Sequence, residues 1–146
     1  MLPNTGILVR MNVKSKGPAR RLLEPILSQD HELVLSEFLL EETARVLSYP
    51  RLLQLYNPTQ NEIVEHVALL RARADIVSPI VYEPVVLADP NDDPVVYTAI
   101  AGRCDILCAL DRHFYIPQVL SFCSGRGIRI MDDVALLEIL KRRDRP

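Results

Sequence analysis

Acidic residues gather where the sequence predicts the ends of helices and strands. They form three groups along the chain: Glu41 and Glu42, then Asp89, Asp92 and Asp93, then Asp111. A single acid in such a place usually caps a helix or is a solvated charge. Several carboxylates at one edge of a sheet repel one another, and a hard cation such as Mg²⁺ or Mn²⁺, which prefers oxygen ligands, relieves that repulsion. The pattern therefore predicts a site for a divalent metal ion.

The segments that carry these acids alternate between short apolar runs and helical patterns. Residues 32–35 predict a strand, and Ser36 is a good N-cap for a helix over 37–48 that Tyr49-Pro50 stops. The apolar run 104–110 predicts a strand that ends at Asp111, and 127–131 predicts a last short strand. Two further short apolar segments, 76–77 and 85–87, lie on either side of a proline-marked crossing.

Further helices are predicted between these strands, over 19–27, 60–74, 95–102 and 134–141. Pro25 is expected to kink or shorten the first of them. Asp93 before Pro94 fits an N-cap with proline at the first helical position, and Gly102 fits the C-terminal stop. Ile63, Val67 and Leu70 should form the buried face of the helix over 60–74.

Strands separated by helices imply right-handed crossovers, so the predicted fold class is α/β, a three-layer α/β/α sandwich with a central, mostly parallel sheet. The length of 146 residues fits a single domain over 1–146. In such sheets ligands bind beyond the carboxyl ends of the strands. Asp111 lies at such an end, and Asp93 begins a helix that can share the same edge, so the two are expected to converge.

Composition limits the functional classes. The net charge of -2 gives no overall basic signal, so any binding of a nucleic-acid backbone must come from local patches. The sequence contains no long uncharged apolar stretch and no secretion signal, which predicts a soluble, cytoplasmic protein that does not enter a membrane. Three cysteines, an odd number, indicate reduced thiols rather than a disulfide framework.

Several site chemistries are disfavoured. The sequence has no G-x-x-x-x-G-K loop, no G-x-G-x-x-G and no G-x-S-x-G, which argues against a triphosphatase, a Rossmann dehydrogenase and an α/β-hydrolase. A receiver-type phosphoacceptor domain would need acids after the first strand, and residues 1–10 contain none. Cys104, Cys108 and His113 lack a second ligand pair for zinc, so buried structural thiols are the favoured interpretation.

A combination of motifs along nearly the whole chain resembles the bacterial PIN-domain proteins that are described as toxin components of toxin–antitoxin pairs. The segments that carry the resemblance are Asn4-Thr5-Gly6 followed by apolar residues, where the family has D-T-N, Leu33-Val34-Leu35-Ser36-Glu37 leading to Leu40-Glu41-Glu42, Tyr49-Pro50-Arg51, Asp89-Pro90-Asn91-Asp92-Asp93-Pro94, Ala101-Gly102-Arg103-Cys104-Asp105, Leu110-Asp111-Arg112-His113-Phe114 and Gly127-Ile128-Arg129-Ile130. Each piece alone is weak, and the combination is specific.

The resemblance implies roles for individual residues. It makes Glu42, Asp93 and Asp111 the catalytic acids, with Glu41 as the alternative to Glu42 if the helix register is shifted by one. The implied metal ligands are Asn4, Glu42, Asp89, Asp92, Asp93 and Asp111, the cofactor is Mg²⁺ or Mn²⁺, and the implied activity is hydrolysis of RNA phosphodiester bonds. The implied partners are RNA, a cognate antitoxin protein and a second copy of the chain.

Asn4 is the main departure from the family pattern. Its amide offers a neutral oxygen where the family has a carboxylate, which predicts weaker metal binding and slower cleavage. Two hypotheses therefore stay open: a metal-dependent endoribonuclease, and a catalytically impaired PIN domain that binds RNA or a partner protein without turnover. His113 is a further substitution, interpreted as a proton carrier, a phosphate contact or an exposed loop histidine.

A third hypothesis is a scaffold that acts through assembly, because the helix over 60–74 and the apolar residues Leu52, Leu53 and Leu55 could pair as a homodimer. Cations that could hold an RNA backbone are spread along the chain. They are Arg10, Lys14, Lys16, Arg20, Arg21, Arg103 and Arg112.

Overall fold

The central strands are short and parallel. A computed structural model describes residues 1–28 and 31–143, with strands β1 (Leu2–Pro3), β2 (Val34–Leu35), β3 (Asp75–Ile76), β4 (Ile106–Cys108) and β5 (Arg129–Met131). β4 lies between β1 and β5 in one sheet, β2 pairs with β3 in a second, and every pairing is parallel. The Val34 amide donates to the Met1 carbonyl oxygen at 2.9 Å, which joins the two sheets edge to edge.

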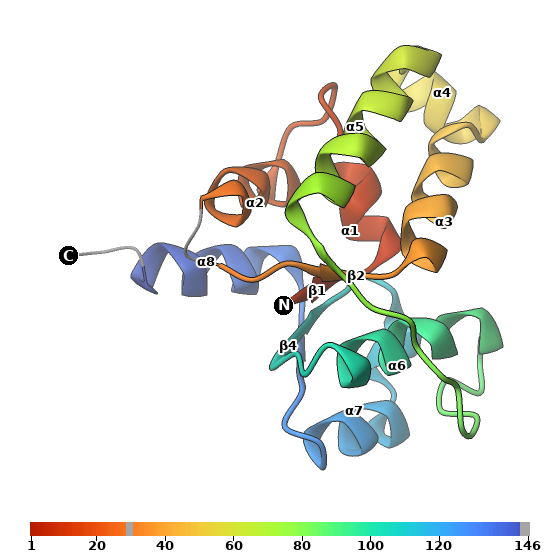
Figure 1. The fold of residues 1–146 in the computed structure, drawn as a ribbon, viewed down its shortest axis with the longest axis vertical. Coiled ribbons are helices and arrows are strands. Elements are labelled where there is room, and N and C mark those ends of the chain that lie inside the picture. The colour runs from red at the N-terminus through yellow and green to blue at the C-terminus, as the bar shows by residue number, and fades with distance from the viewer. Residues whose placement is uncertain (29–30, 144–146) are drawn as a thin grey trace.

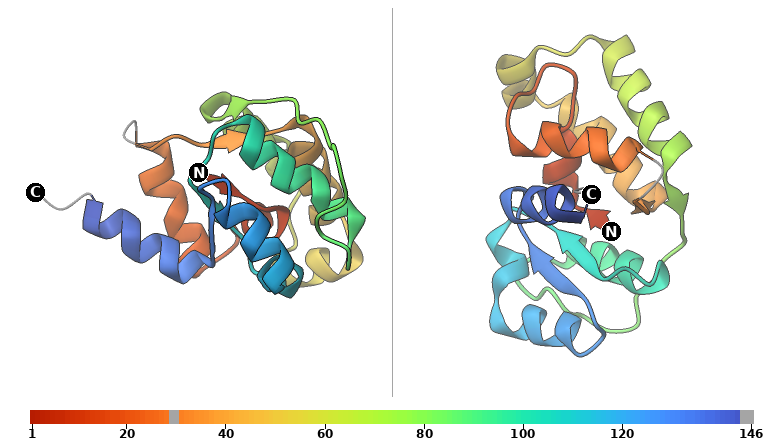
Figure 2. Two further views of the ribbon diagram at one scale, coloured as in Figure 1. Left: turned by 90° about the horizontal axis from the view of Figure 1, so that it is seen from below. Right: turned by 90° about the vertical axis from the view of Figure 1, so that its left-hand side faces the viewer.

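Helices flank the strands on both sides (Figures 1 and 2). They are α1 (Thr5–Arg10), α2 (Pro18–Leu27), α3 (Glu37–Leu47), α4 (Pro50–Tyr56), α5 (Gln60–Arg73), α6 (Asp93–Ala101), α7 (Pro117–Ser124) and α8 (Asp133–Arg143), with short 3₁₀ helices η1 (Pro90–Asp92) and η2 (Arg112–Tyr115). In Figure 1 the group α1, α3, α4 and α5 lies above the strands, and α6 and α7 lie below them. The α/β class with a parallel arrangement of strands is confirmed.

Local signals fix the helices that carry site residues. Ser36 caps α3 by accepting a hydrogen bond from the Leu39 amide at 3.4 Å, as predicted. Thr59 and Glu62 form a reciprocal capping box at the start of α5. Pro18 starts α2 at its first position, where no amide hydrogen is needed, and the helix continues through Pro25 to Leu27 instead of being shortened by it.

Three helices were not predicted. Pro50 begins α4 at its first position, although Tyr49-Pro50 was interpreted only as the end of the preceding helix. Residues 5–10 form α1 directly after the two-residue strand β1, and Pro117 begins α7. These helices matter for function because α1 and α4 bring residues far apart in sequence to the same side of the molecule (Figure 1).

The cysteines lie in the apolar core. Cys104, Cys108 and Cys123 are all buried with free thiols, and burial raises the pKa of Cys123 to about 11. A raised pKa keeps the sulfur neutral and unreactive, as expected of a small buried apolar group. This agrees with structural thiols rather than zinc ligands.

Candidate metal centre

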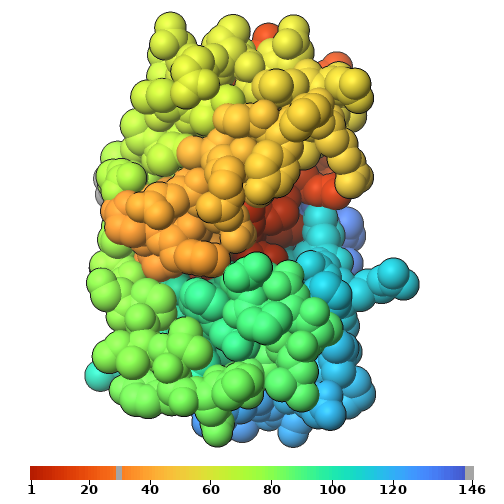
Figure 3. All heavy atoms as spheres, turned by 90° about the vertical axis from the view of Figure 1, so that its right-hand side faces the viewer, coloured from red at the N-terminus to blue at the C-terminus, as the bar shows by residue number. Residues whose placement is uncertain are grey.

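The acidic residues meet in a cleft beyond the carboxyl ends of β1 and β4. The cleft has a volume of about 470 Å³ and is lined by α1, α3, α4, η1 and the residues that follow β4. Figure 3 shows it as a hollow between α3 and α4 above and the segment around η1 and α6 below, with N-terminal residues exposed inside. This is the edge at which parallel sheets bind ligands.

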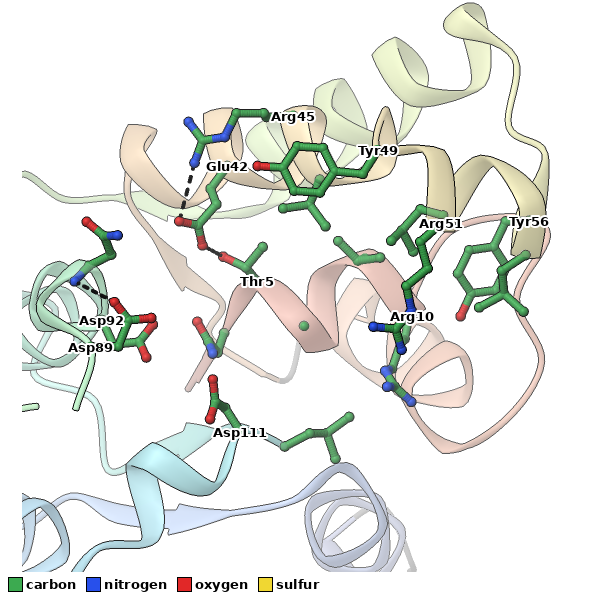
Figure 4. Close-up of a pocket in the computed structure, with 18 residues that line it drawn as sticks. Thr5, Arg10, Glu42, Arg45, Tyr49, Arg51, Tyr56, Asp89, Asp92 and Asp111 are labelled. Carbon is green, nitrogen blue, oxygen red and sulfur yellow. Dashed lines mark hydrogen bonds and ion pairs between the residues drawn. The ribbon is translucent and has the colours of Figure 1, made fainter.

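Five of the six predicted metal ligands line this cleft: Asn4, Glu42, Asp89, Asp92 and Asp111. In Figure 4 the side chains of Glu42, Asp89, Asp92 and Asp111 point toward a common space. Glu42 is partly buried there, whereas Glu41 is exposed and does not line the cleft, so the helix register favours Glu42.

Neighbouring groups hold the carboxylates in place. The Thr5 hydroxyl donates to Glu42 Oε1, and Arg45 lies 3.6 Å from the other oxygen of Glu42. Asp111 Oδ1 accepts from the His113 amide at 3.0 Å. Asp89 Oδ1 likewise accepts a backbone amide two residues ahead, that of Asn91, at 3.1 Å. The fixed orientation lowers the entropy lost when a ligand binds.

Asp93 is the predicted site residue that the structure places elsewhere. Its Oδ1 accepts from the Val85 amide at 3.0 Å and from the Val86 amide at 2.8 Å, and Asp93 does not line the cleft. It is also the first residue of α6 and not the cap outside the helix. The expected convergence of Asp93 with Asp111 is therefore not seen, and Asp92 occupies that place beside Asp111.

Unpaired oxygen atoms face the cleft from two elements. Asn4 Oδ1 and Asp92 Oδ2 are buried and have no hydrogen-bond partner among the described residues, although His113 Nδ1 lies 3.8 Å from Asp92 Oδ2. Asn4 is 7% exposed and Asp92 9%. A buried acceptor without a partner is costly, and an oxygen-preferring divalent ion would satisfy both atoms. The donor set therefore fits a hard cation.

His113 belongs to the same cluster. One ligand atom from each of Asp89, Asp92 and His113 lies within 4.8 Å of the others. His113 Nδ1 is 3.3 Å from Asp111 Oδ1 and has no hydrogen-bond partner. The residue is therefore a further candidate ligand, a role beyond those that the sequence suggested for it.

Burial and crowding act together on Asp92. Burial, as the largest cause, and the nearby carboxylates of Asp89, Asp111 and Glu42 together raise the pKa of Asp92 from 3.8 to about 7, while His113 opposes the shift. The metal-free cleft therefore holds Asp92 partly protonated at neutral pH. A bound cation would favour the charged form instead.

A pH-dependent stability follows from this raised pKa. The pKa of Asp92 is higher in the folded state than its unfolded value of 3.8. Between about pH 4 and pH 7, Asp92 therefore keeps its proton in the folded chain and has lost it in the unfolded chain. The free energy of unfolding should thus fall with rising pH across this window, by at most about 4 kcal/mol from Asp92. In thermal melts with chelator, Asp92→Asn should melt above wild type at pH 8 and close to it at pH 4. Exposed Asp105→Asn serves as the control, and an equal difference at both pH values would contradict the account.

A comparison with protein families finds a match to the PIN domain over residues 4–113. The chain belongs to the PIN-domain family. PIN domains are typically metal-dependent nucleases, and the matched segment contains all the acids named above together with Asn4 and His113. No curated protein and no solved structure matched the chain. Within residues 1–28 and 31–143, no helix has the length and hydropathy needed to cross a membrane.

Residues outside the acidic set also line the PIN-domain cleft, and the sequence, in which Tyr49 and Arg51 stand out only within a family motif, indicated no role for them in a site. Arg45 and Tyr49 project from the end of α3 and the residues after it, and Arg51 projects from α4. The signal that was available is spacing, because Arg45 and Tyr49 follow Glu42 by three and seven residues and so share its helix face. The spacing of Thr5, whose hydroxyl donates to Glu42, did not indicate that it would lie near the acids.

Proposed function

We propose that this PIN domain is a metal-dependent endoribonuclease that hydrolyses RNA phosphodiester bonds. The observation that carries the proposal is the pair of buried oxygens without a hydrogen-bond partner, Asn4 Oδ1 and Asp92 Oδ2, on residues that line a cleft with three further carboxylates. The proposed ligands are Asn4, Asp89, Asp92 and Asp111, with Glu42 and His113 beside them. Asp93 is left out, because both of its known partners are backbone amides of the preceding loop.

The protein's contribution is positioning. A divalent ion bound in this cleft, Mg²⁺ or Mn²⁺, would activate a water and neutralise the charge that develops on the departing oxygen. Thr5 and Arg45 keep Glu42 directed into the cleft, and the His113 amide keeps Asp111 there. In hydrolysis the water oxygen bonds to phosphorus and the bond from phosphorus to the leaving oxygen breaks. The leaving oxygen takes up a proton from solvent to become a free hydroxyl, and one proton of the water must be removed. Glu42 and His113 are the titratable groups placed to accept it.

The test is cleavage of an end-labelled RNA by purified protein. Activity should require Mn²⁺ or Mg²⁺, disappear in chelator and disappear in Asp111→Asn, whose fold should be unchanged because an Asn oxygen can still accept the His113 amide. Activity that persists in chelator would exclude the metal-dependent reaction.

Asn4→Asp should strengthen metal binding. The substitution restores a charged ligand, and we expect about a ten-fold lower Kd for Mn²⁺ by titration calorimetry and a matching gain in cleavage at limiting Mn²⁺. Asp105→Asn, which removes an exposed charge elsewhere, should leave both quantities unchanged. An Asn4→Asp protein that binds Mn²⁺ no better than wild type would show that Asn4 Oδ1 does not reach the ion.

A second candidate function rests on the same residue. With an amide in place of a carboxylate at Asn4, a domain that binds RNA or a partner protein without turnover is also supported. It predicts an inactive wild type and an Asn4→Asp variant that cuts RNA, whereas the first proposal predicts activity in both.

We further propose a role as the toxin of a toxin–antitoxin pair, on the basis of the motifs that the chain shares with such proteins. Expression of the chain should then arrest bacterial growth, and co-expression of a small protein encoded beside it should restore growth. Expression of the Asp111→Asn variant should not arrest growth. Arrest by Asp111→Asn to the same degree as wild type would contradict a toxic activity that depends on the cleft.

We also propose a homodimer. Exposed apolar side chains on α4 and α5 support it, with Leu55 66% and Val64 58% exposed. Light scattering over a dilution series would test the proposal, and a monomer at all concentrations would exclude it.

A further inference from the structure

The end of the cleft opposite the carboxylates is positively charged. Arg10, the last residue of α1, and Arg51, near the start of α4, both line it. Figure 4 shows their guanidinium groups directed into this end and away from Asp92 and Asp111. The two residues are more than forty positions apart in sequence, and the packing of α1 and α4 against α3 brings them to one cleft.

Neither guanidinium is neutralised by the part of the chain that the structure describes. Arg10 and Arg51 are exposed, and no ion pair or side-chain hydrogen bond involves either of them in residues 1–28 and 31–143. Arg45, in the same cleft, differs because it is paired with Glu42. Two unpaired guanidiniums in one cleft form a site for an anion, and the planar donor fork of arginine matches a phosphate.

An aromatic ring lies between the acidic end of the cleft and the two arginines. Tyr49 is 45% exposed, lines the same cleft and is drawn in Figure 4 between Arg45 and Arg51. Among the described residues, it makes no ring contact of the kind that Tyr97 makes with Phe122. An exposed tyrosine between the acids and an anion site offers a surface on which an unpaired base can stack.

We propose that Arg10 and Arg51 bind the phosphate next to the one that is cleaved, and that Tyr49 stacks on the base attached to it. The identity of the anion as RNA rests on the proposed function, whereas the anion site rests on the two unpaired arginines. Because a base in a duplex is already stacked and paired, its face is not available to Tyr49, and the cleft selects an unpaired strand. The acids then lie at the cleaved phosphate of the bound RNA strand, and the arginines lie at the neighbouring phosphate.

Binding measured without turnover tests the site directly. In chelator, fluorescence anisotropy with a labelled single-stranded RNA of twelve nucleotides should show about a ten-fold weaker Kd for Arg10→Ala/Arg51→Ala. The slope of log K against log salt should fall by about 0.7, since the two arginines share one phosphate and each phosphate contact on a single strand contributes about 0.7. Tyr49→Leu should weaken binding about ten-fold with little change in that slope.

The matched control is Arg129→Gln. Arg129 is exposed and begins β5, so it lies at the opposite edge of the sheet from the cleft. Its loss should change neither the affinity nor the salt slope by more than the error. A fully paired RNA of the same length should bind the wild type more weakly, and its Kd should change by the same factor in every variant.

Kinetics separate this proposal from the proposed function. A contact to a neighbouring phosphate is the same before and during the reaction, so the double arginine variant should raise KM about ten-fold and leave kcat nearly unchanged. If no variant or wild type cleaves RNA but binding in chelator still depends on the arginines and Tyr49, the nuclease proposal fails and this site stands.

Two results would overturn the site. One is an affinity for single-stranded RNA that falls no further in the double arginine variant than in Arg129→Gln. The other is an arginine-dependent affinity for a polyglutamate peptide that RNA does not compete for, which would assign this end of the cleft to an acidic protein segment.

Discussion

Asp92→Asn is expected to lower kcat/KM for RNA cleavage about a thousand-fold. Asp92 supplies a buried oxygen without a hydrogen-bond partner in the acidic cluster, and burial, followed by the neighbouring carboxylates, raises its pKa. A catalytic metal contributes several kcal/mol, and about 4 kcal/mol corresponds to a thousand-fold in rate. The measurement is initial rate against RNA concentration at saturating Mn²⁺, with circular dichroism to show that the variant is folded.

The neighbouring acids provide the controls for this experiment. Glu41→Gln removes an exposed charge beside Glu42 and should leave kcat/KM unchanged. Asp93→Asn keeps an oxygen that can accept the Val85 and Val86 amides and should retain most of the activity. A folded but inactive Asp93→Asn protein together with an active Asp92→Asn protein would reverse the assignment of the two residues.

Asp93→Ala is expected to destabilise the fold by about 4 kcal/mol. It leaves the amides of Val85 and Val86 without their acceptor, and both residues are buried. Hydrogen bonds to a charged group contribute about 1.5–3 kcal/mol each, and a loss of this size lowers Tm by about 10 °C for a chain of this length. Differential scanning calorimetry at pH 7 in chelator measures the change.

A partly exposed carboxylate gives the comparison. Asp89 also accepts a backbone amide, that of Asn91, but solvent can replace this contact, so Asp89→Ala should cost less than about 1 kcal/mol. Equal losses in Asp89→Ala and Asp93→Ala would show that the two amides of the loop do not depend on Asp93.

The sequence predicted the class of fold because strand and helix signals alternate clearly. Ser36 and the capping residues at Thr59 mark helix starts through local hydrogen bonds, which depend on neighbours in the chain. Strand lengths were overestimated, since the apolar run over 104–110 continues past the three residues that pair in β4. An apolar run in the sequence indicates that its residues are buried. It does not indicate which of them form backbone hydrogen bonds with a neighbouring strand.

The site was predicted in outline and not in its details. Asp92 and Asp93 are adjacent and chemically identical, and successive residues of a helical turn point about 100° apart, so the sequence cannot say which one faces the cleft. Arg51 joins the cleft through the position of α4, a helix that the sequence did not predict. Both facts depend on tertiary packing.

Asp92 and Asp93 are neighbours in the chain but have different structural roles. One residue faces the cleft, and the next holds the amides of Val85 and Val86. For protein engineering, the loop before α6 therefore has a part that should tolerate changes of length and a part that should not. Insertions near Ile80 and Tyr82, which are 64% and 80% exposed, should leave this connection intact, whereas a change of length between Val86 and Asp93 would displace the acidic cluster.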